Sequence, residues 1–212
     1  MKIRWFGHSC FLITSSVGIK ILTDPFDASV GYKVPKVSAD IVTISHAHRD
    51  HSYTGNIKGD FKRFDKPGNY TEKGITVKGI SSFHDDSRGS KRGDNIIFNM
   101  DIDGISVCHC GDIGQLIDED QKAAIGKVDI LMVPVGGFYT IGYKEAYELG
   151  ELLKPKYIIP MHFKTPEIDF PIEDELRFIE MYEESVIFGK QEIEITKENL
   201  TDNPKVIRLE YA

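Results

Sequence analysis

Cysteine is scarce in this chain, which has only Cys10, Cys108 and Cys110 among its 212 residues. Small secreted proteins held by disulfides carry a dense and usually even set of cysteines. A sparse, odd set argues against such a scaffold and favours a reducing compartment. The spacing of Cys108 and Cys110 suggests a thiolate–zinc site, but a structural zinc normally takes four ligands and too few cysteines remain. We expect buried strand cysteines instead.

Long apolar runs are also missing. The most apolar segments, 130–135 and 157–163, are far shorter than the ~20 residues that a membrane-spanning helix needs. No apolar stretch typical of a signal peptide follows the first residues of the chain. These absences predict a cytoplasmic protein that does not enter a membrane.

Positive charge is not in excess, because 26 Lys and Arg face 33 Asp and Glu, for a formal net charge of −7. A protein that binds nucleic acid usually presents a basic face, so we do not expect a nucleic-acid partner. The hydrophobic share of 41% and the charged share of 28% exclude general disorder. We expect a globular protein that acts on a small molecule.

The order of the predicted elements indicates one layered α/β domain over residues 1–212. Short β-branched and aromatic runs dominate the first half, and helices alternate with buried strands in the second half. Strands are predicted at 2–6, 11–14, 19–23, 41–45, 75–80, 95–100, 105–110, 130–135, 157–161, 186–188, 193–195 and 206–209. Helices are predicted at 118–125, 144–153 and 173–184.

Histidine carries the strongest chemical signal, since three of the seven histidines fall within the segment His46-Ala47-His48-Arg49-Asp50-His51. Composition alone predicts on the order of 0.0006 occurrences of H-x-H-x-D-H in this chain. Alternation after the apolar strand 41–44 places His46 and His48 on one side, where both can bind one ion. If the chain then turns into a helix, Asp50 and His51 could hold a second ion. Imidazole and carboxylate suit zinc, iron, manganese or nickel, so the residues do not choose the metal.

This motif and its surroundings resemble the metallo-β-lactamase superfamily. The order of motifs over about residues 3–165 is similar to that of the UlaG-like branch, with ascorbate-phosphate lactonase and the catalytic domain of N-acyl-phosphatidylethanolamine phospholipase D. The other segments that carry the resemblance are Trp5-Phe6-Gly7-His8-Ser9, Thr23-Asp24-Pro25-Phe26, Phe83-His84-Asp85, Arg92-Gly93-Asp94-Asn95, His109-Cys110-Gly111-Asp112, Pro134-Val135-Gly136-Gly137 and Ile159-Pro160-Met161-His162-Phe163-Lys164.

The resemblance implies a four-layer αβ/βα sandwich with one or two divalent ions, zinc being favoured and Mn, Fe or Ni remaining open. The ligands that it implies are His46, His48 and His84 for the first ion, Asp50, His51 and His162 for the second, and Asp112 between them.

The third histidine of the first ion has two candidates. His84 lies where a predicted strand leaves into a loop, so its side chain can reach a cleft. His109 lies inside the predicted strand 105–110, where a hydrogen-bonded histidine beneath the site is the simpler interpretation. We favour His84 and keep His109 as the alternative.

Several further residues are candidates for supporting roles. His8 is either a structural histidine or part of the cleft rim. Asp24 either caps a turn or, as the resemblance implies, braces the metal loop by accepting backbone N–H bonds. The loop 136–140 is either a cleft wall or a plain connection. The cations that could meet an anionic substrate group are Arg88, Arg92 and Lys164.

These residues predict a metal-dependent hydrolase in which the metal centre supplies hydroxide and Asp50 orients it or moves its proton. The substrate expected is a small lactone, another ester or a phosphodiester. The alternatives left open are an iron-containing redox enzyme of the same superfamily and a nuclease.

Overall fold

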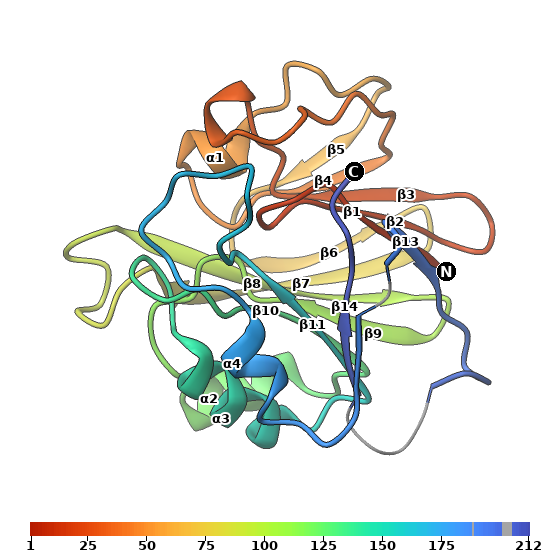
Figure 1. The fold of residues 1–212 in the computed structure, drawn as a ribbon. Helices are drawn as coiled ribbons and strands as arrows, with labels where there is room; N and C mark the ends of the chain where they lie inside the picture. The colour runs from red at the N-terminus through yellow and green to blue at the C-terminus, as the bar shows by residue number, and fades with distance from the viewer. Residues whose placement is uncertain (188, 201–204) are drawn as a thin grey trace.

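Two mixed β-sheets pack face to face in the computed structural model, which describes residues 1–187, 189–200 and 205–212 (Figure 1). The N-terminal sheet has the strand order β13 (Glu192–Glu194), β1 (Lys2–Trp5), β2 (Phe11–Thr14), β3 (Lys20–Thr23), β4 (Ile41–Thr43) and β5 (Lys62–Phe64). The C-terminal sheet has the order β12 (Ser185–Ile187), β14 (Lys205–Arg208), β11 (Tyr157–Met161), β10 (Ile130–Pro134), β9 (Ile105–His109), β8 (Asp94–Ile102), β7 (Ile75–Phe83) and β6 (Gly68–Glu72).

Helices cover the C-terminal sheet more fully than the N-terminal one. Figure 1 shows α2 (Glu119–Ile125), α3 (Tyr143–Leu153) and α4 (Leu176–Ile179) on the outer side of the C-terminal sheet. The N-terminal sheet carries only α1 (Arg49–Ser52), the 3₁₀ turn η1 (Ala28–Val30) and loops. The predicted sandwich is confirmed, with one outer layer reduced to short pieces. None of the described helices is both long and apolar enough to span a bilayer.

Alternation along β3 and β4 explains why the N-terminal sheet is covered on both faces. Ile21 and Ile41 belong to the core that is shared with the C-terminal sheet. Their neighbours Leu22 and Val42 point the other way and join a second cluster with residues of the loops, such as Phe26. Both faces of these strands are therefore buried, as their continuous apolar sequence predicts.

The predicted helix 173–184 is wrong over most of its length, because α4 covers only Leu176–Ile179. The Glu173 backbone is already committed elsewhere: its N–H donates to the Gly136 carbonyl, and its carbonyl accepts from Lys164. The Asp174 carboxylate accepts from the Leu176 N–H, so the helix begins only there.

Two strands of the structure, β5 and β6, were not predicted from the sequence. The strands β5 and β6 have mostly exposed or half-exposed residues and lack an apolar alternation that would predict them. The predicted strand 186–188 corresponds to β12, but Phe188 lies outside the described residues.

Parallel strands in both sheets direct their carboxyl ends to the loops of the site. β3 runs parallel to β4, and β10 runs parallel to β9 and β11. Ligand sites in α/β proteins commonly form beyond the carboxyl ends of such strands. Ser45 follows β4, Asp112 follows β9 and His162 follows β11, so three distant segments of the chain supply one site.

Candidate metal centre

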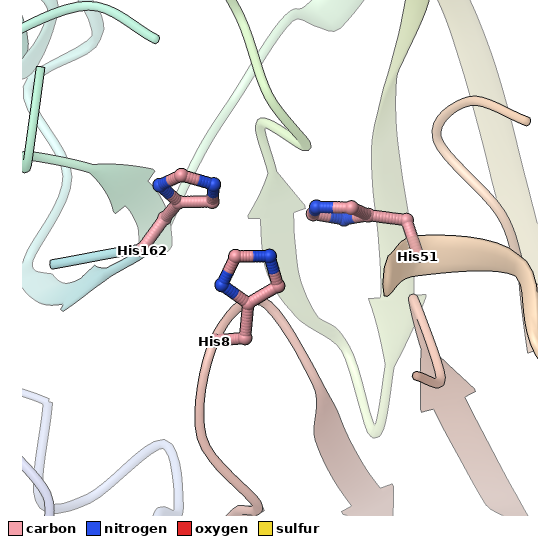
Figure 2. A group of neighbouring side chains, drawn as sticks. All are labelled: His8, His51 and His162. Carbon is pink, nitrogen blue, oxygen red and sulfur yellow. The ribbon is translucent and has the colours of Figure 1, made fainter. Parts of the chain in front are cut away.

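Histidine side chains from several loops converge at the carboxyl ends of these strands. The ligand atoms of each of three residue groups lie within 4.8 Å of one another. Figure 2 shows His8, from the loop after β1, His51, from α1, and His162, from the end of β11, around a common space. The three groups are His46, His48 and His84; His8, His51 and His162; and Asp24, His46 and His51.

Asp112 lies between the histidine groups. Its Oδ2 is 3.2 Å from the Nε2 atoms of His51, His84 and His162. The same oxygen is 4.0 Å from Nε2 of His46. One buried carboxylate therefore faces imidazoles of both groups that consist of histidines alone. This is the placement that the resemblance implied for a bridging residue.

The donor atoms of this centre fit a divalent cation. Among the described residues, Asp112 Oδ1 and the Nε2 atoms of His46 and His51 are buried without a hydrogen-bond partner. Buried polar atoms are rarely left in this state, because each loses its contacts with water. Imidazole nitrogen and carboxylate oxygen are the ligands that zinc, manganese, iron and nickel accept.

Asp24 fixes the orientation of two of these histidines. Its Oδ2 accepts from His51 Nδ1 at 3.0 Å and from Ser45 Oγ at 2.6 Å. Ser45 Oγ in turn lies 2.9 Å from His46 Nδ1, so a proton on that nitrogen donates to the hydroxyl. Both histidines therefore turn Nε2 towards the centre, which is the nitrogen that a metal ion would bind. Burial lowers the pKa of His51, but the Asp112 and Asp24 carboxylates raise it well above its ordinary value.

The structure supports the bracing role that was considered for Asp24. Its Oδ1 accepts the Ser45 backbone N–H at 2.8 Å, which ties the start of the histidine motif to the loop after β3. Burial raises the pKa of this carboxyl, but the hydrogen bond from His51 and the nearby histidines bring it below its ordinary value. Asp24 is therefore ionised when it accepts these bonds.

His109 is occupied beneath the centre. Its Nε2 is 2.8 Å from the Ser9 carbonyl oxygen, to which it donates, and its Nδ1 accepts the Gly111 N–H at 3.2 Å. Burial lowers the pKa of His109, which keeps the ring neutral. Since both ring nitrogens have protein partners, the geometry favours His84 in the first histidine group.

Asn95 and Gly111 set the position of Asp112. The Asp112 N–H donates to Asn95 Oδ1 at 2.9 Å, and Asn95 Nδ2 donates to the Cys110 carbonyl at 2.9 Å. Gly111 has φ +55°, and a Cβ there would lie 2.4 Å from both Asn95 Oδ1 and Ser45 Cβ. Only glycine therefore allows the chain to bring Asp112 so close to the histidine motif.

Asp50 and His8 form a pair beside the centre. His8 Nε2 is 3.4 Å from Asp50 Oδ2, and the Asp50 side chain is 31% exposed whereas that of His8 is fully buried. Burial raises the pKa of Asp50, but the bond to His8 and the proximity of His51 bring it well below its ordinary value. Asp50 is thus an ionised carboxylate that still reaches solvent.

Burial keeps two imidazoles of the centre, those of His46 and His8, neutral. It lowers the pKa of His46 to about 3 and, with the neighbouring His162, that of His8 to about 4. A neutral imidazole is the form that binds a metal ion.

Three residues of the centre have left-handed backbone conformations. The φ angles are 53° at His8, 39° at Asp24 and 51° at His162. Residues other than glycine adopt this region at a cost of about 1–2 kcal/mol. Each of these positions directs a functional side chain into the centre at the expense of local backbone strain.

Two cavities adjoin the centre. The smaller, of about 270 Å³, is lined by His48, Asp50, His84, Arg92, Asp112, Tyr139, His162 and Phe170. The larger, of about 620 Å³, also touches His46, His48 and Arg92 and extends towards Arg63 and Asp65. Tyr139 makes the loop 136–140 part of the cavity wall, which was one of its two interpretations.

The three candidate cations differ in their placement. Arg92 lines both cavities, whereas Arg88 is exposed and lines neither. Lys164 also lies outside both cavities, since its Nζ donates to the Phe170 carbonyl at 3.0 Å. Lys164 instead holds the loop that carries Phe170.

The cysteines take no part in the centre. Cys10, Cys108 and Cys110 are free and buried, as expected. Burial raises the pKa of Cys10, and the contact with Cys108 together with burial raises that of Cys110. Neither of these two is therefore a thiolate at neutral pH.

Three residues with clear roles were not predicted to belong to the site. Ser45 connects Asp24 to His46, Asn95 positions Asp112, and Phe170 lines the smaller cavity. Asn95 ends one of the segments that carry the resemblance and Ser45 precedes His46, but serine and asparagine are too common in loops to stand out as site residues. Phe170 lies in the last part of the chain, where no motif points to the site.

Comparison with known proteins places the chain in a family. Residues 2–162 match the model of the β-lactamase superfamily domain. A UPF0173 metal-dependent hydrolase of Carboxydothermus hydrogenoformans is 32% identical, over 78% of this chain and 85% of the relative. Another, of Archaeoglobus fulgidus, is 30% identical over 82% of this chain and 88% of the relative.

A solved structure agrees with this placement. A Thermotoga maritima protein described as a candidate Zn-dependent hydrolase of the metallo-β-lactamase superfamily is 40% identical. It superposes with a TM-score of 0.83 over 99% of both chains. The chain therefore belongs to the metallo-β-lactamase superfamily and, within it, to the UPF0173 family.

Proposed function

We propose that this protein is a metal-dependent hydrolase with two divalent-ion positions that share Asp112. The observation that carries the proposal is the equal spacing of 3.2 Å from Asp112 Oδ2 to imidazole nitrogens of both histidine groups. The names of the UPF0173 relatives and of the Thermotoga protein support metal-dependent hydrolysis.

The group of His46, His48 and His84 would hold the first ion. For the second ion the resemblance implies Asp50, His51 and His162, with Asp112 shared. His51 and His162 group with His8 in the structure, and Asp50 Oδ2 lies beside them, 3.7 Å from His51 Nε2. Zinc is favoured because the Thermotoga protein is described as Zn-dependent, and Mn, Fe or Ni would suit the same donors. When bound, such ions lower the pKa of water and polarise a carbonyl or phosphoryl oxygen.

The protein's own groups supply orientation and proton transfer. Asp50 is ionised, lines the smaller cavity and is partly exposed, so its carboxylate can orient an attacking water and accept its proton. His8 holds that carboxylate through Nε2 from the buried side. Tyr139 and Phe170 add aromatic side chains to the wall of the same space.

The substrate proposed is a small lactone, another ester or a phosphodiester. The cavity of about 270 Å³ next to the centre suits the reacting part of a small molecule, and the larger cavity can receive the remainder. The resemblance to the UlaG-like branch favours a lactone or a phosphorylated compound.

Metal stoichiometry and a substrate panel test this function together. Protein purified without added metal is analysed for its elements, stripped with a chelator and reloaded with Zn, Mn, Fe or Ni. Each form is assayed on a lactone, a 4-nitrophenyl ester and bis(4-nitrophenyl) phosphate. We expect hydrolysis to disappear on stripping and to return with up to two ions per chain. Folded protein that binds no transition metal, or activity that survives stripping, would contradict the proposal.

The alternatives predict different outcomes in the same experiment. An iron-containing redox enzyme would be isolated as coloured, iron-bearing protein that is inactive on all three substrates. A nuclease would cleave RNA in preference to the small phosphodiester.

A further inference from the structure

Arg92 is a cation without an acidic partner at the mouth of the centre. Its side chain lines both cavities and is half-buried. Among the ion pairs of the described residues none involves Arg92, whereas Arg63 and Arg49 each pair with an aspartate. An arginine that serves only the fold is normally exposed or paired when it is this close to a cavity.

An aromatic ring supports the Arg92 guanidinium. Its Cζ lies over the ring of Tyr139, 5.4 Å from the ring centre. A cation–π contact of this kind attracts the guanidinium to the ring while its N–H groups remain available for a ligand. Tyr139 itself lines the smaller cavity, so the pair forms part of the cavity wall.

The backbone of Arg92 is held firmly by Asp85. The buried Asp85 carboxylate accepts four backbone N–H bonds of 2.7–2.9 Å, which come from Ser87, Gly89, Lys91 and Arg92. Burial raises the pKa of Asp85, but these four bonds lower it to about 2. The loop is therefore organised around one ionised side chain.

The same loop is tied to a histidine of the centre. The His84 N–H donates to the Gly93 carbonyl at 3.0 Å, and the Gly93 N–H donates to the Gly89 carbonyl at 2.9 Å. The backbone of Arg92 is thus held at a fixed distance from that of His84 by hydrogen bonds, and Tyr139 is the contact of its guanidinium. A charge whose backbone is fixed relative to a reactive centre favours one substrate length.

We propose that Arg92 binds an anionic group, a carboxylate or a phosphate, that the substrate carries beside the bond to be hydrolysed. This inference rests on the proposed function and names the substrate class for the same cavity. A planar guanidinium pairs with either group through two parallel N–H···O bonds. An anionic substrate would also supply a negatively charged partner for the Arg92 guanidinium, which has none among the described residues.

Two esters of similar size test the charge preference. Mono-4-nitrophenyl succinate carries a free carboxylate, and 4-nitrophenyl butyrate has a methyl group in its place. With metal-loaded protein, we expect Arg92→Met to raise the ratio of KM for the succinate ester to KM for the butyrate ester by about 10- to 100-fold. Arg92→Gln provides a second neutral variant, and Arg92→Lys should recover part of the loss. An unchanged ratio in both neutral variants would overturn the proposal.

Arg88→Met is the matched control. Arg88 lies on the same loop, is exposed and lines neither cavity, so its loss removes the same charge without removing a cavity wall. We expect the KM ratio to stay as in the unchanged protein. An equal change in Arg88→Met would mean that general charge and not Arg92 is responsible, and the proposal would fail.

Binding without turnover separates this inference from the proposed hydrolysis. Calorimetric titration of metal-loaded protein with succinate, and separately with inorganic phosphate, shows which anion is preferred. We expect the Kd of the preferred anion to rise about tenfold or more in Arg92→Met and not in Arg88→Met. Anion binding that depends on Arg92 in a protein that hydrolyses no ester would preserve the binding site and reject the hydrolase. Wild-type protein that binds neither anion, or equal binding by both variants, would reject the site.

Discussion

The two sides of the metal centre differ in how far the protein encloses them. We call the group of His46, His48 and His84 the open side and the group of His8, His51 and His162 the enclosed side. His48 is exposed and lines both cavities, whereas His8 and His51 are buried and line neither. On the enclosed side, Asp24 holds His51 directly, but on the open side it reaches His46 only through Ser45. We therefore expect substrate to enter from the side of His48, whereas internal hydrogen bonds orient His51 on the enclosed side.

Asp112→Asn should have the largest effect, because Asp112 is the residue that both sides share. The variant keeps the shape of the side chain but loses the charge that reduces repulsion between two cations. We expect turnover to fall by orders of magnitude and the second ion, beside His51 and His162, to be lost first. Metal analysis of the purified variant measures this. Two tightly bound ions with nearly unchanged activity would show that Asp112 is not shared and would reopen the role of His109.

Replacing His84 or His109 by alanine should show which of the two histidines binds the first ion and which one supports the centre from beneath. His84→Ala should remove the first ion or abolish activity. His109→Ala should retain more metal but lower the free energy of unfolding by about 1–3 kcal/mol, since the Ser9 carbonyl and the Gly111 N–H lose their partner. Denaturant unfolding and metal titration of both variants provide the measurement. Stronger metal loss in His109→Ala than in His84→Ala would reverse the assignment.

Asp24→Asn and Ser45→Ala should show a smaller, graded effect on metal affinity. Removing a carboxylate that orients metal-binding histidines typically weakens affinity by about 10- to 100-fold. We expect Asp24→Asn to weaken both ions and Ser45→Ala to weaken mainly the ion held by His46. Competition with a chelator gives the two dissociation constants. Equal losses in the two variants would mean that Asp24 does not act on His51 independently of Ser45.

Asp85→Asn should have the smallest effect at neutral pH and a distinct effect in acid. The pKa of Asp85 is about 2 in the folded protein against an ordinary 3.8, so its contribution to stability is complete above about pH 4. That contribution declines as the pH falls towards 2, because the unfolded state then binds a proton that the folded Asp85 carboxylate does not bind, which favours unfolding. The variant should be less stable than the wild type at pH 7 and should lose less further stability between pH 4 and 2. Urea unfolding across this range tests it, and parallel curves would contradict the role of Asp85.

Much of the centre could be predicted because its residues are rare types at fixed spacing. Three histidines within six residues mark His46, His48 and His51, and the strand-to-loop position of His84 separates it from His109. Ser45 and Asn95 could not be found in this way, since their roles depend on which loops meet in space and their residue types are common in every loop.

The same contrast applies to the fold. The continuous apolar strands β10 and β11 were predictable because both of their faces are buried. The edge strand β5 is mostly exposed, and only its pairing with β4 makes it a strand. The helical pattern of 173–184 was overridden by backbone hydrogen bonds of Glu173 to two distant segments, which no local periodicity records.

The left-handed conformations of His8, Asp24 and His162 have a consequence for how this sequence can change. At each position glycine would relieve the backbone strain but would also remove a side chain of the centre. At Asp24 the exchange would leave Ser45 Oγ and His51 Nδ1 without their acceptor, so we expect selection for heat resistance without selection for metal binding to favour glycine at His8 or His162 before Asp24. Selection for stability alone and selection for metal binding are therefore expected to act in opposite directions on these backbone conformations.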